Sequence, residues 1–276
     1  MSIIVPPIKS QGIKTKLIPW IESECKNIKY EKWIEPFLGT GVVAFNIKPS
    51  KALLCDVNPH IINFYKKLQD KSIDYKTVRS FLEQEGEKLQ ITNGEHYYEV
   101  RNRFNNNYNS LDFLFLNRSC FNGMMRFNGK GKFNVPFCRK PNRFAPALIT
   151  KICNQVKKIS NIILDADFEF KIQDFNNTIE SADDNDLIYC DPPYIGRNTN
   201  YFDLWNEEKE YCLNNILKCK KSFIMLSTWY QSQYRKNDYI DLLWNDYNIK
   251  IREHFYHIGA KESNRKPIEE ALLTNF

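Results

Sequence analysis

The feature that most constrains the fold is a short apolar segment, residues 33–37, that runs directly into Gly39-Thr40-Gly41. The helical sequence VVAFN follows, and a second apolar segment occupies 52–56. This spacing predicts a strand, a glycine turn, a helix and a strand, with another helix over 58–68. The order opens a parallel, doubly wound α/β sheet, because a helix must return the chain to the start of the next parallel strand.

The same alternation returns in the second half of the chain, after a stretch of different character. Residues 72–118 have helical patterns, and residues 118–146 interleave Gly, Asn, Pro, aromatic and basic residues. We therefore expect one α/β domain, formed by 1–67 and 146–276, interrupted by an inserted, mostly helical module at 68–145. The other elements predicted for the α/β domain are helices over 12–27 (bent at Pro19), 146–158 and 207–219, and strands over 186–190, 222–227, 249–256 and 270–275.

Composition narrows the class of protein. Hydrophobic residues make up 42% of 276, and no run of 18 apolar residues occurs, which predicts a soluble globular chain without a membrane span. The N-terminus lacks the order of a signal peptide, and the eight cysteines contain no CxxC pair. His254 and His257 would point to opposite faces of a strand. We expect a cytoplasmic, monomeric protein with reduced cysteines and no metal.

The glycine turn is a candidate ligand-binding loop. Gly39 and Gly41 let the backbone pass close to a bound molecule, with the N-terminus of the next helix facing it. Asp56 ends the following strand, where its carboxylate can accept hydrogen bonds from a ribose diol. A tight turn without a ligand is the alternative. The third glycine of the dinucleotide fingerprint is absent, which argues against NAD.

The second candidate site is Asp191-Pro192-Pro193-Tyr194, which follows the apolar strand 187–190. Neither proline has an N–H, so this rigid edge offers acceptors: the Asp191 carboxylate and the Pro192 carbonyl. Such an edge suits a planar amino group with two N–H donors, and Tyr194 offers a face for the attached ring. Holding both hydrogens favours a pyramidal nitrogen and stabilises the charge that develops as it attacks. A proline-rich turn at the end of a strand is the alternative.

A basic segment lies between these two sites. Residues 118–143 contain seven basic side chains and no Asp or Glu, so the segment's charge of +7 exceeds the +6 of the whole chain. This is an electrostatic footprint for phosphates, and its phenylalanines are available for packing or wedging. A solvated basic loop is the alternative.

Together these motifs make the chain resemble the Dam-like DNA N6-adenine methyltransferases. The resemblance starts at KSQGIK (9–14) and continues through EPFLGTGVVAFN and CDVNPHIINFY. It also includes LNRSCFNGMMRFNGKGKFNVPF, YCDPPY and the closing ALLTN. It implies a Rossmann-like methyltransferase domain with an inserted DNA-recognition domain carrying a β-hairpin, and transfer of methyl from S-adenosyl-L-methionine to N6 of a flipped adenine in double-stranded DNA.

The resemblance also assigns roles to residues. Phe37, Gly39 and Gly41 would surround the methionine end of the cofactor, and Asp56 its ribose. Arg126 would read a guanine beside the target adenine, through the bidentate geometry that suits arginine. The implied catalytic residues are Asp191, Pro192, Pro193 and Tyr194. The implied cofactor-binding residues are Lys14, Phe37, Gly39, Thr40, Gly41, Asp56, Asp174 and Phe175. The implied DNA-binding residues are Lys9, Arg118, Phe121, Asn122, Met124, Arg126, Asn128, Lys130, Lys132, Asn134, Arg139 and Lys140.

Several alternatives stay open at the level of sequence. The acceptor chemistry also suits a methyltransferase acting on an RNA adenine or a protein amide, and a non-catalytic DNA-binding pseudoenzyme is the other rival. The recognition site is expected to contain GA, with GATC as a first guess, and a cognate restriction endonuclease is a possible partner in the same system. Tyr201, Phe202 and Trp205 are candidates for a lid over the flipped base, whereas Arg265 and Glu270 receive no role.

Overall fold

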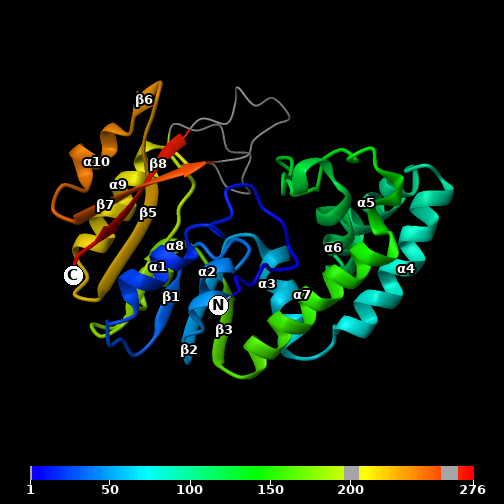
Figure 1. The fold of residues 1–276 in the computed structure, drawn as a ribbon, viewed down its shortest axis with the longest axis horizontal. Coiled ribbons are helices and arrows are strands. Elements are labelled where there is room, and N and C mark those ends of the chain that lie inside the picture. The colour runs from blue at the N-terminus through cyan, green and yellow to red at the C-terminus, as the bar shows by residue number, and fades with distance from the viewer. Residues whose placement is uncertain (1, 196–204, 256–266) are drawn as a thin grey trace.

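A mostly parallel sheet forms the centre of the α/β part of the molecule (Figure 1). The structure is a computed structural model and describes residues 2–195, 205–255 and 267–276. Within them the strand order is β3-β2-β1-β4-β5-β8-β7, with β6 paired to β5. The strands are β1 Trp33–Glu35, β2 Lys51–Asp56, β3 Asp167–Ile172, β4 Leu187–Cys190, β5 Phe223–Ser232, β6 Arg235–Lys236, β7 Asn248–Phe255 and β8 Pro267–Thr274. The first five in this order are parallel, and β8 is antiparallel to both of its neighbours.

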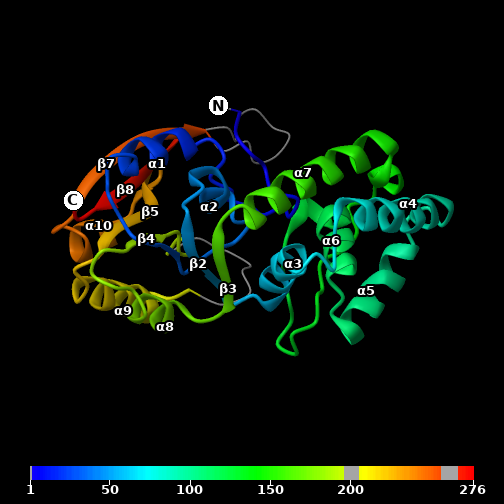
Figure 2. The ribbon, with the colours of Figure 1, turned by 90° about the horizontal axis from the view of Figure 1, so that it is seen from below.

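Helices cover both faces of the sheet (Figure 2). One face carries α1 (Ile18–Cys25) and α2 (Val42–Ile47), and the other carries α8 (Phe175–Glu180), α9 (Glu207–Lys218) and α10 (Asp238–Leu243). All residues of β1 and β4 are buried, as expected for parallel strands covered on both faces. Their side chains alternate between the two cores. The Rossmann-like α/β prediction is confirmed.

A helical module extends from one end of the sheet (Figure 1). It follows α3 (Pro59–Gln69) and contains α4 (Tyr75–Ile91), α5 (His96–Asn107) and α6 (Ser110–Ser119), and the long helix α7 (Pro146–Leu164) returns the chain to β3. Short 3₁₀ turns, Phe121–Gly123 and Pro141–Phe144, flank the basic segment. Side chains of Asn58, Asp74 and Asn109 cap the N-termini of α3, α4 and α6 by accepting backbone N–H groups.

One hydrophobic core joins the module to the sheet. Phe64 of α3, Phe115 of α6 and Val156 of α7 belong to the same buried cluster as Trp33 and Tyr189 of the central strands. The module is helical as predicted, but the boundaries 1–67, 68–145 and 146–276 stay a prediction, because the core is continuous across them. None of the helices within the described residues is long and apolar enough to cross a membrane.

Several elements differ from the sequence prediction. The strands β3 and β6 and the helices α8 and α10 were not predicted. In β3 only Phe168 and Phe170 are buried, so this segment lacks the continuous apolar run of β1 and β4. The first helix begins at Ile18 rather than near residue 12, because Pro19 lies in its first turn, where proline starts a helix rather than bending one.

Candidate active site

The glycine loop and the Asp-Pro-Pro-Tyr segment meet at one edge of the sheet. β1 and β4 are adjacent and parallel, and the two loops leave their carboxyl ends. The strand order reverses between these two strands, since β2 and β3 extend to one side and β5 to the other. In open α/β sheets, ligands bind in the crevice at such a reversal point. The topology therefore brings the two sequence motifs to a single site.

Asp191 is held by two side chains that are far from it in sequence. Lys14 Nζ lies 2.9 Å from Asp191 Oδ1, and Ser227 Oγ donates a hydrogen bond of 2.9 Å to the same oxygen. Lys14 is only 5% exposed, so its charge is held largely out of water beside the carboxylate. Tyr189 shares a hydrogen bond of 3.0 Å with Ser227. These contacts fix the orientation of Asp191 before any substrate arrives.

Two contacts fix Tyr194, one to the face of its ring and one to its hydroxyl. The ammonium of Lys14 lies 4.6 Å from the centre of the tyrosine ring, a cation–π contact. The Tyr194 hydroxyl donates to the buried carboxylate of Glu270 on β8. Lys14 thus contacts both ends of the Asp191–Tyr194 segment, which places it on the acceptor side of the site.

Asp56, at the end of the neighbouring strand β2, holds the glycine loop by hydrogen bonds. Gly39 N–H donates 2.8 Å to its Oδ2, and Asn58 N–H donates 2.8 Å to its Oδ1. Burial raises the pKa of Asp56 to about 6, although the two backbone hydrogen bonds oppose the shift. A Cβ built on Gly39 would meet nothing within 4 Å, so the backbone there borders open space. The loop and the carboxylate therefore form an accessible polar edge.

The turn between β1 and α2 depends on Gly41, whose backbone adopts the left-handed conformation. Gly41 is the N-cap of α2 at φ +72°, and a Cβ there would lie 2.3 Å from the Phe45 ring. The Thr40 carbonyl accepts a 2.6 Å hydrogen bond from the buried Tyr65 hydroxyl. Glycine is thus required at 41 both by backbone conformation and by the packing of Phe45.

An aromatic cluster lies beside the loop. Phe37 stacks on Phe175 with ring centres 5.5 Å apart, and Trp205 packs against both rings. Asp174 precedes Phe175 and caps α8 through a 2.8 Å bond from Asn176 N–H. Trp205, a candidate for the lid, packs against these rings, and its place in a lid stays a prediction. Tyr201, Phe202 and Arg265 lie outside the described residues.

The predicted hairpin lies within the basic segment. Its two arms are joined by isolated antiparallel bridges, Cys120↔Phe137 and Phe127↔Phe133. The Asn128 side chain closes the turn by accepting from the N–H groups of Lys130 and Lys132. Backbone bonds close the same turn, from Asn128 N–H to the Lys132 carbonyl (2.9 Å) and from Gly131 N–H to the Asn128 carbonyl (2.8 Å), so the predicted hairpin is present.

Arg126 lies close to the turn of this hairpin and is oriented by Asn134 on the opposite arm. Its Nε donates 2.8 Å to Asn134 Oδ1, and its Nη2 donates 3.2 Å to the Asn134 carbonyl. Phe121 is 51% exposed, Asn122 adopts φ +54°, and Met124 is half-buried. The exposed basic and polar residues of the segment are Asn122, Asn128, Lys130, Lys132, Arg139, Lys140 and Asn142.

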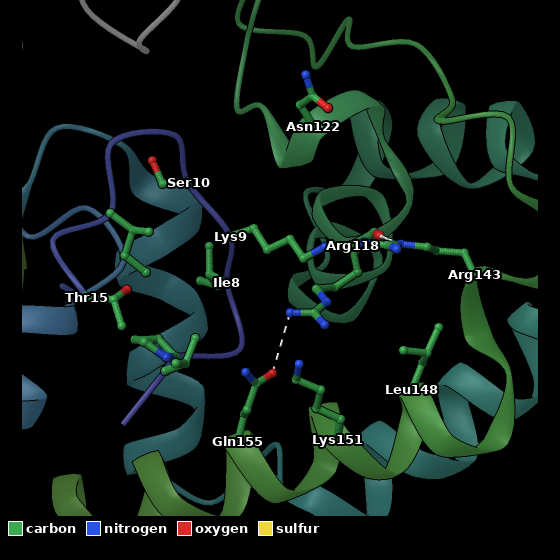
Figure 3. A pocket seen from close by; sticks show the side chains of 13 residues that line it. Ile8, Lys9, Ser10, Thr15, Arg118, Asn122, Arg143, Leu148, Lys151 and Gln155 are labelled. Carbon is green, nitrogen blue, oxygen red and sulfur yellow. Dashed lines mark hydrogen bonds between the residues drawn. The ribbon is translucent and has the colours of Figure 1, made fainter. Parts of the chain in front are cut away.

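A basic cavity of about 320 Å³ lies next to the hairpin (Figure 3). Lys9, Arg118, Arg143 and Lys151 line it, and none of its lining side chains among the described residues is acidic. Burial and the charges of the two arginines lower the pKa of Lys9 to about 8. Four cations without an acidic neighbour favour an anion in this cavity.

Arg118 differs from the other basic residues of its segment. It is 7% exposed, and its Nη1 donates to the Pro7 carbonyl at 3.2 Å and to Gln155 Oε1 at 3.5 Å. Its buried Nε has no hydrogen-bond partner. Arg118 is thus largely buried but lines the basic cavity, and its predicted contact with DNA stays a prediction.

Sequence reasoning missed three residues of the site. Ser227 is one: it follows Leu226, which pairs with Cys190, so the parallel register places it beside Asp191. Glu270 received no role because its strand is antiparallel and distant in sequence. Glu35 is 2% exposed at the end of β1 and accepts a 3.0 Å bond from the Trp33 indole. A charged residue inside an apolar strand was the signal that could have identified it.

The fold and the two loops define a Rossmann-like α/β protein in which the glycine loop and the Asp191–Tyr194 segment meet at the reversal point of the sheet. The D12 class N6 adenine-specific DNA methyltransferase family matches residues 10–258, and the chain belongs to this family of enzymes. It is 28% identical to a type II methyltransferase of Lactococcus lactis subsp. cremoris, over 98% of this chain and 95% of that one. It is 30% identical to a type II methyltransferase of Methanocaldococcus jannaschii, over 99% of both chains. Identity to a DNA adenine methylase of Vibrio cholerae is 32%, over 70% of this chain and 66% of the other.

Proposed function

We propose that the chain transfers methyl from S-adenosyl-L-methionine to N6 of an adenine flipped out of double-stranded DNA, within a site that contains GA. The observation that carries this proposal is the preformed acceptor edge of Asp191 beside the Gly39–Asp56 loop, at one reversal point of the sheet. Flipping follows from access, because the amino group of a stacked adenine cannot reach an enclosed pocket.

The cofactor fits the residues of the glycine loop. Asp56 would accept from the ribose hydroxyls, and the open side of Gly39 leaves room for the ligand. Phe37 and Phe175 form an apolar wall beside the loop, with Asp174 next to them. When bound, S-adenosyl-L-methionine supplies an electrophilic methyl group on its sulfonium.

The acceptor edge would orient the target amine. Lys14 and Ser227 both bond Asp191 Oδ1, which leaves Oδ2 and the Pro192 carbonyl as acceptors for the two hydrogens of N6. The Tyr194 ring, fixed by Glu270, would support the base. As N6 gains a bond it becomes positive, so the Asp191 carboxylate stabilises the developing charge. The excess proton then leaves N6 to Asp191 or to water.

The basic surface supports duplex DNA as the substrate. Lys130, Lys132 and Lys140 are exposed on the hairpin segment, and the basic cavity with Lys9 and Arg118 lies beside it. Phosphate neutralisation by such groups provides sequence-independent affinity. We propose that the protein acts as a monomer, and that a cognate restriction endonuclease recognises the same sequence, in keeping with the type II names of two relatives.

Replacing Arg126 with alanine is expected to reduce discrimination at one base pair by about 1–3 kcal/mol, because a bidentate contact to guanine would be lost. The measurement is methylation of duplexes that vary only at the base beside the adenine. Lys130→Ala is the matched control and should weaken all duplexes equally while lowering the salt dependence. Unchanged discrimination in Arg126→Ala would remove this residue from base reading.

Cofactor affinity is expected to fall as pH drops through about 6, where Asp56 gains a proton and loses acceptor capacity. Asp56→Asn should bind more weakly and show no such pH step. Equilibrium binding of S-adenosyl-L-homocysteine between pH 5 and pH 8 checks this, each value at fixed ionic strength. The same step in Asp56→Asn as in the wild type would assign the titration to another group.

The proposed reaction itself is tested by transfer of tritiated methyl to unmethylated genomic DNA, followed by nucleoside analysis and single-molecule mapping. N6-methyladenine within one GA-containing motif is the expected product. Label in RNA or protein but not in DNA would overturn the assignment of the acceptor.

A further inference from the structure

A buried histidine of the cofactor side reaches into the recognition module. His60 lies in the first turn of α3 and is 7% exposed. Its ring is stacked between Tyr108, 5.2 Å away at 28°, and Phe127, 5.0 Å away at 18°. Phe104 and Phe113 complete the surroundings, at 4.9 and 5.7 Å. The four partners come from α5, its C-terminus, α6 and the hairpin.

On its other side, His60 is attached to the proposed ribose-binding carboxylate. Asp56 Oδ1 accepts from the backbone N–H of Asn58 at 2.8 Å, and Asn58 Oδ1 accepts from the backbone N–H of His60 at 3.0 Å. Asp56 Oδ2 holds Gly39 of the glycine loop. Two hydrogen bonds thus connect the carboxylate to the N-terminal turn of α3.

On the hairpin, the residue that contacts His60 is Phe127, which lies next to Arg126, the residue proposed to read the guanine. Phe127 follows Arg126 in sequence and pairs with Phe133 across the hairpin, with the two rings 5.4 Å apart. The stack of Phe127 on His60 therefore joins this arm of the hairpin to the first turn of α3. Burial lowers the pKa of His60 to about 4, so the stacked ring is neutral near pH 7.

We propose that His60 is a positioning residue that couples the two ligands: a cofactor at Asp56 and duplex DNA at the Arg126 hairpin each tighten the binding of the other. This inference rests on the proposed function and goes beyond it, by assigning a coupling residue. Coupling is a free energy shared by two sites and is reciprocal, so it can be measured from either ligand. The element that transmits it is the N-terminal turn of α3 with the aromatic stack.

The test is a binding cycle without turnover. The affinity of S-adenosyl-L-homocysteine is measured alone and with saturating duplex that carries the mapped site, by calorimetry on the full chain. The wild type is expected to bind at least about fivefold tighter with duplex present. In His60→Leu this ratio should fall close to one, whereas His60→Phe, which keeps the stack, should retain it.

The matched control is His96→Leu. His96 is a buried histidine in the same module, but it contacts Glu85 and Glu99 rather than α3. It should retain the coupling although it perturbs packing to a similar degree. Phe127→Leu removes the opposite ring and should lose the coupling equally, with no further loss in the double variant. Phe127→Leu therefore tests the same contact if His60→Leu does not fold.

The possible results distinguish a failure of the coupling proposal from a failure of the proposed function. Coupling absent from the wild type, or retained in both His60→Leu and Phe127→Leu, would overturn the inference while leaving the methyl transfer assignment intact. Loss of coupling in His96→Leu as well would reduce the effect to general destabilisation and would also overturn it. A wild-type chain that binds neither ligand would overturn the proposed function and this inference together.

Discussion

Replacing Asp191 with alanine is expected to abolish methyl transfer while leaving cofactor affinity nearly unchanged. The carboxylate is aligned by Lys14 and Ser227 before substrate binds, so it acts as a preorganised group for the charge that develops on N6. Removing one such group from an active site costs about 10²–10³ in turnover, and Asp191 supplies both an acceptor and a full charge. Single-turnover methylation of a duplex and binding of S-adenosyl-L-homocysteine measure the two halves of the prediction.

A graded series keeps this result interpretable. Alanine at 191 leaves the buried Lys14 ammonium without its carboxylate, which itself destabilises a protein. Asp191→Asn keeps the shape and the bond from Ser227 and should still lose most turnover, because the charge is gone. Ser227→Ala should lose much less, since Lys14 continues to hold Asp191. Full activity in Asp191→Ala would contradict the mechanism.

The sequence predicted most reliably those site residues that belong to a local motif and whose loops a parallel sheet brings to the same edge. Gly39 and Gly41, the Asp-Pro-Pro-Tyr segment and the strands before them are local signals, and parallel topology requires their loops to share one edge. The positions of Gly39, Asp56 and Asp191 could therefore be predicted before the sheet was seen. The structure adds the reason that Gly41 cannot change, which is the close approach of Phe45.

The residues that sequence reasoning missed are held by long-range pairing. Ser227 and Glu270 reach the site through the register of β5 and β8, which no local pattern specifies. The charge run over 118–143 does not indicate that Arg118 lies at the buried end of α6 against Pro7. Burial is decided by which helix faces which, and one charge run can contain both a surface lysine and a core arginine.

The second large effect concerns Glu35, whose replacement by glutamine is expected to stabilise the protein above about pH 5. Burial raises the pKa of Glu35 to about 8 from an ordinary value of 4.5, with the charges of Asp191 and Asp56 adding to the shift. The Trp33 indole and the Ala44 backbone oppose it only partly. The folded chain therefore keeps a proton that the unfolded chain releases over this range.

The sign of the pH dependence follows from that difference. Below about pH 4.5 both states are protonated and Glu35 costs nothing; as pH rises towards 8, stability is lost at about 1.4 kcal/mol per pH unit. Glutamine can accept from the Trp33 indole without ionising, so Glu35→Gln should remove this slope and exceed the wild type by several kcal/mol near pH 8. Urea unfolding of the wild type and of Glu35→Gln at a series of pH values measures the difference in their free energies of unfolding. The titrations of Asp56 and His60 occur in both proteins and cancel in this difference. Parallel stability curves for the two chains would show that Glu35 ionises normally despite its burial.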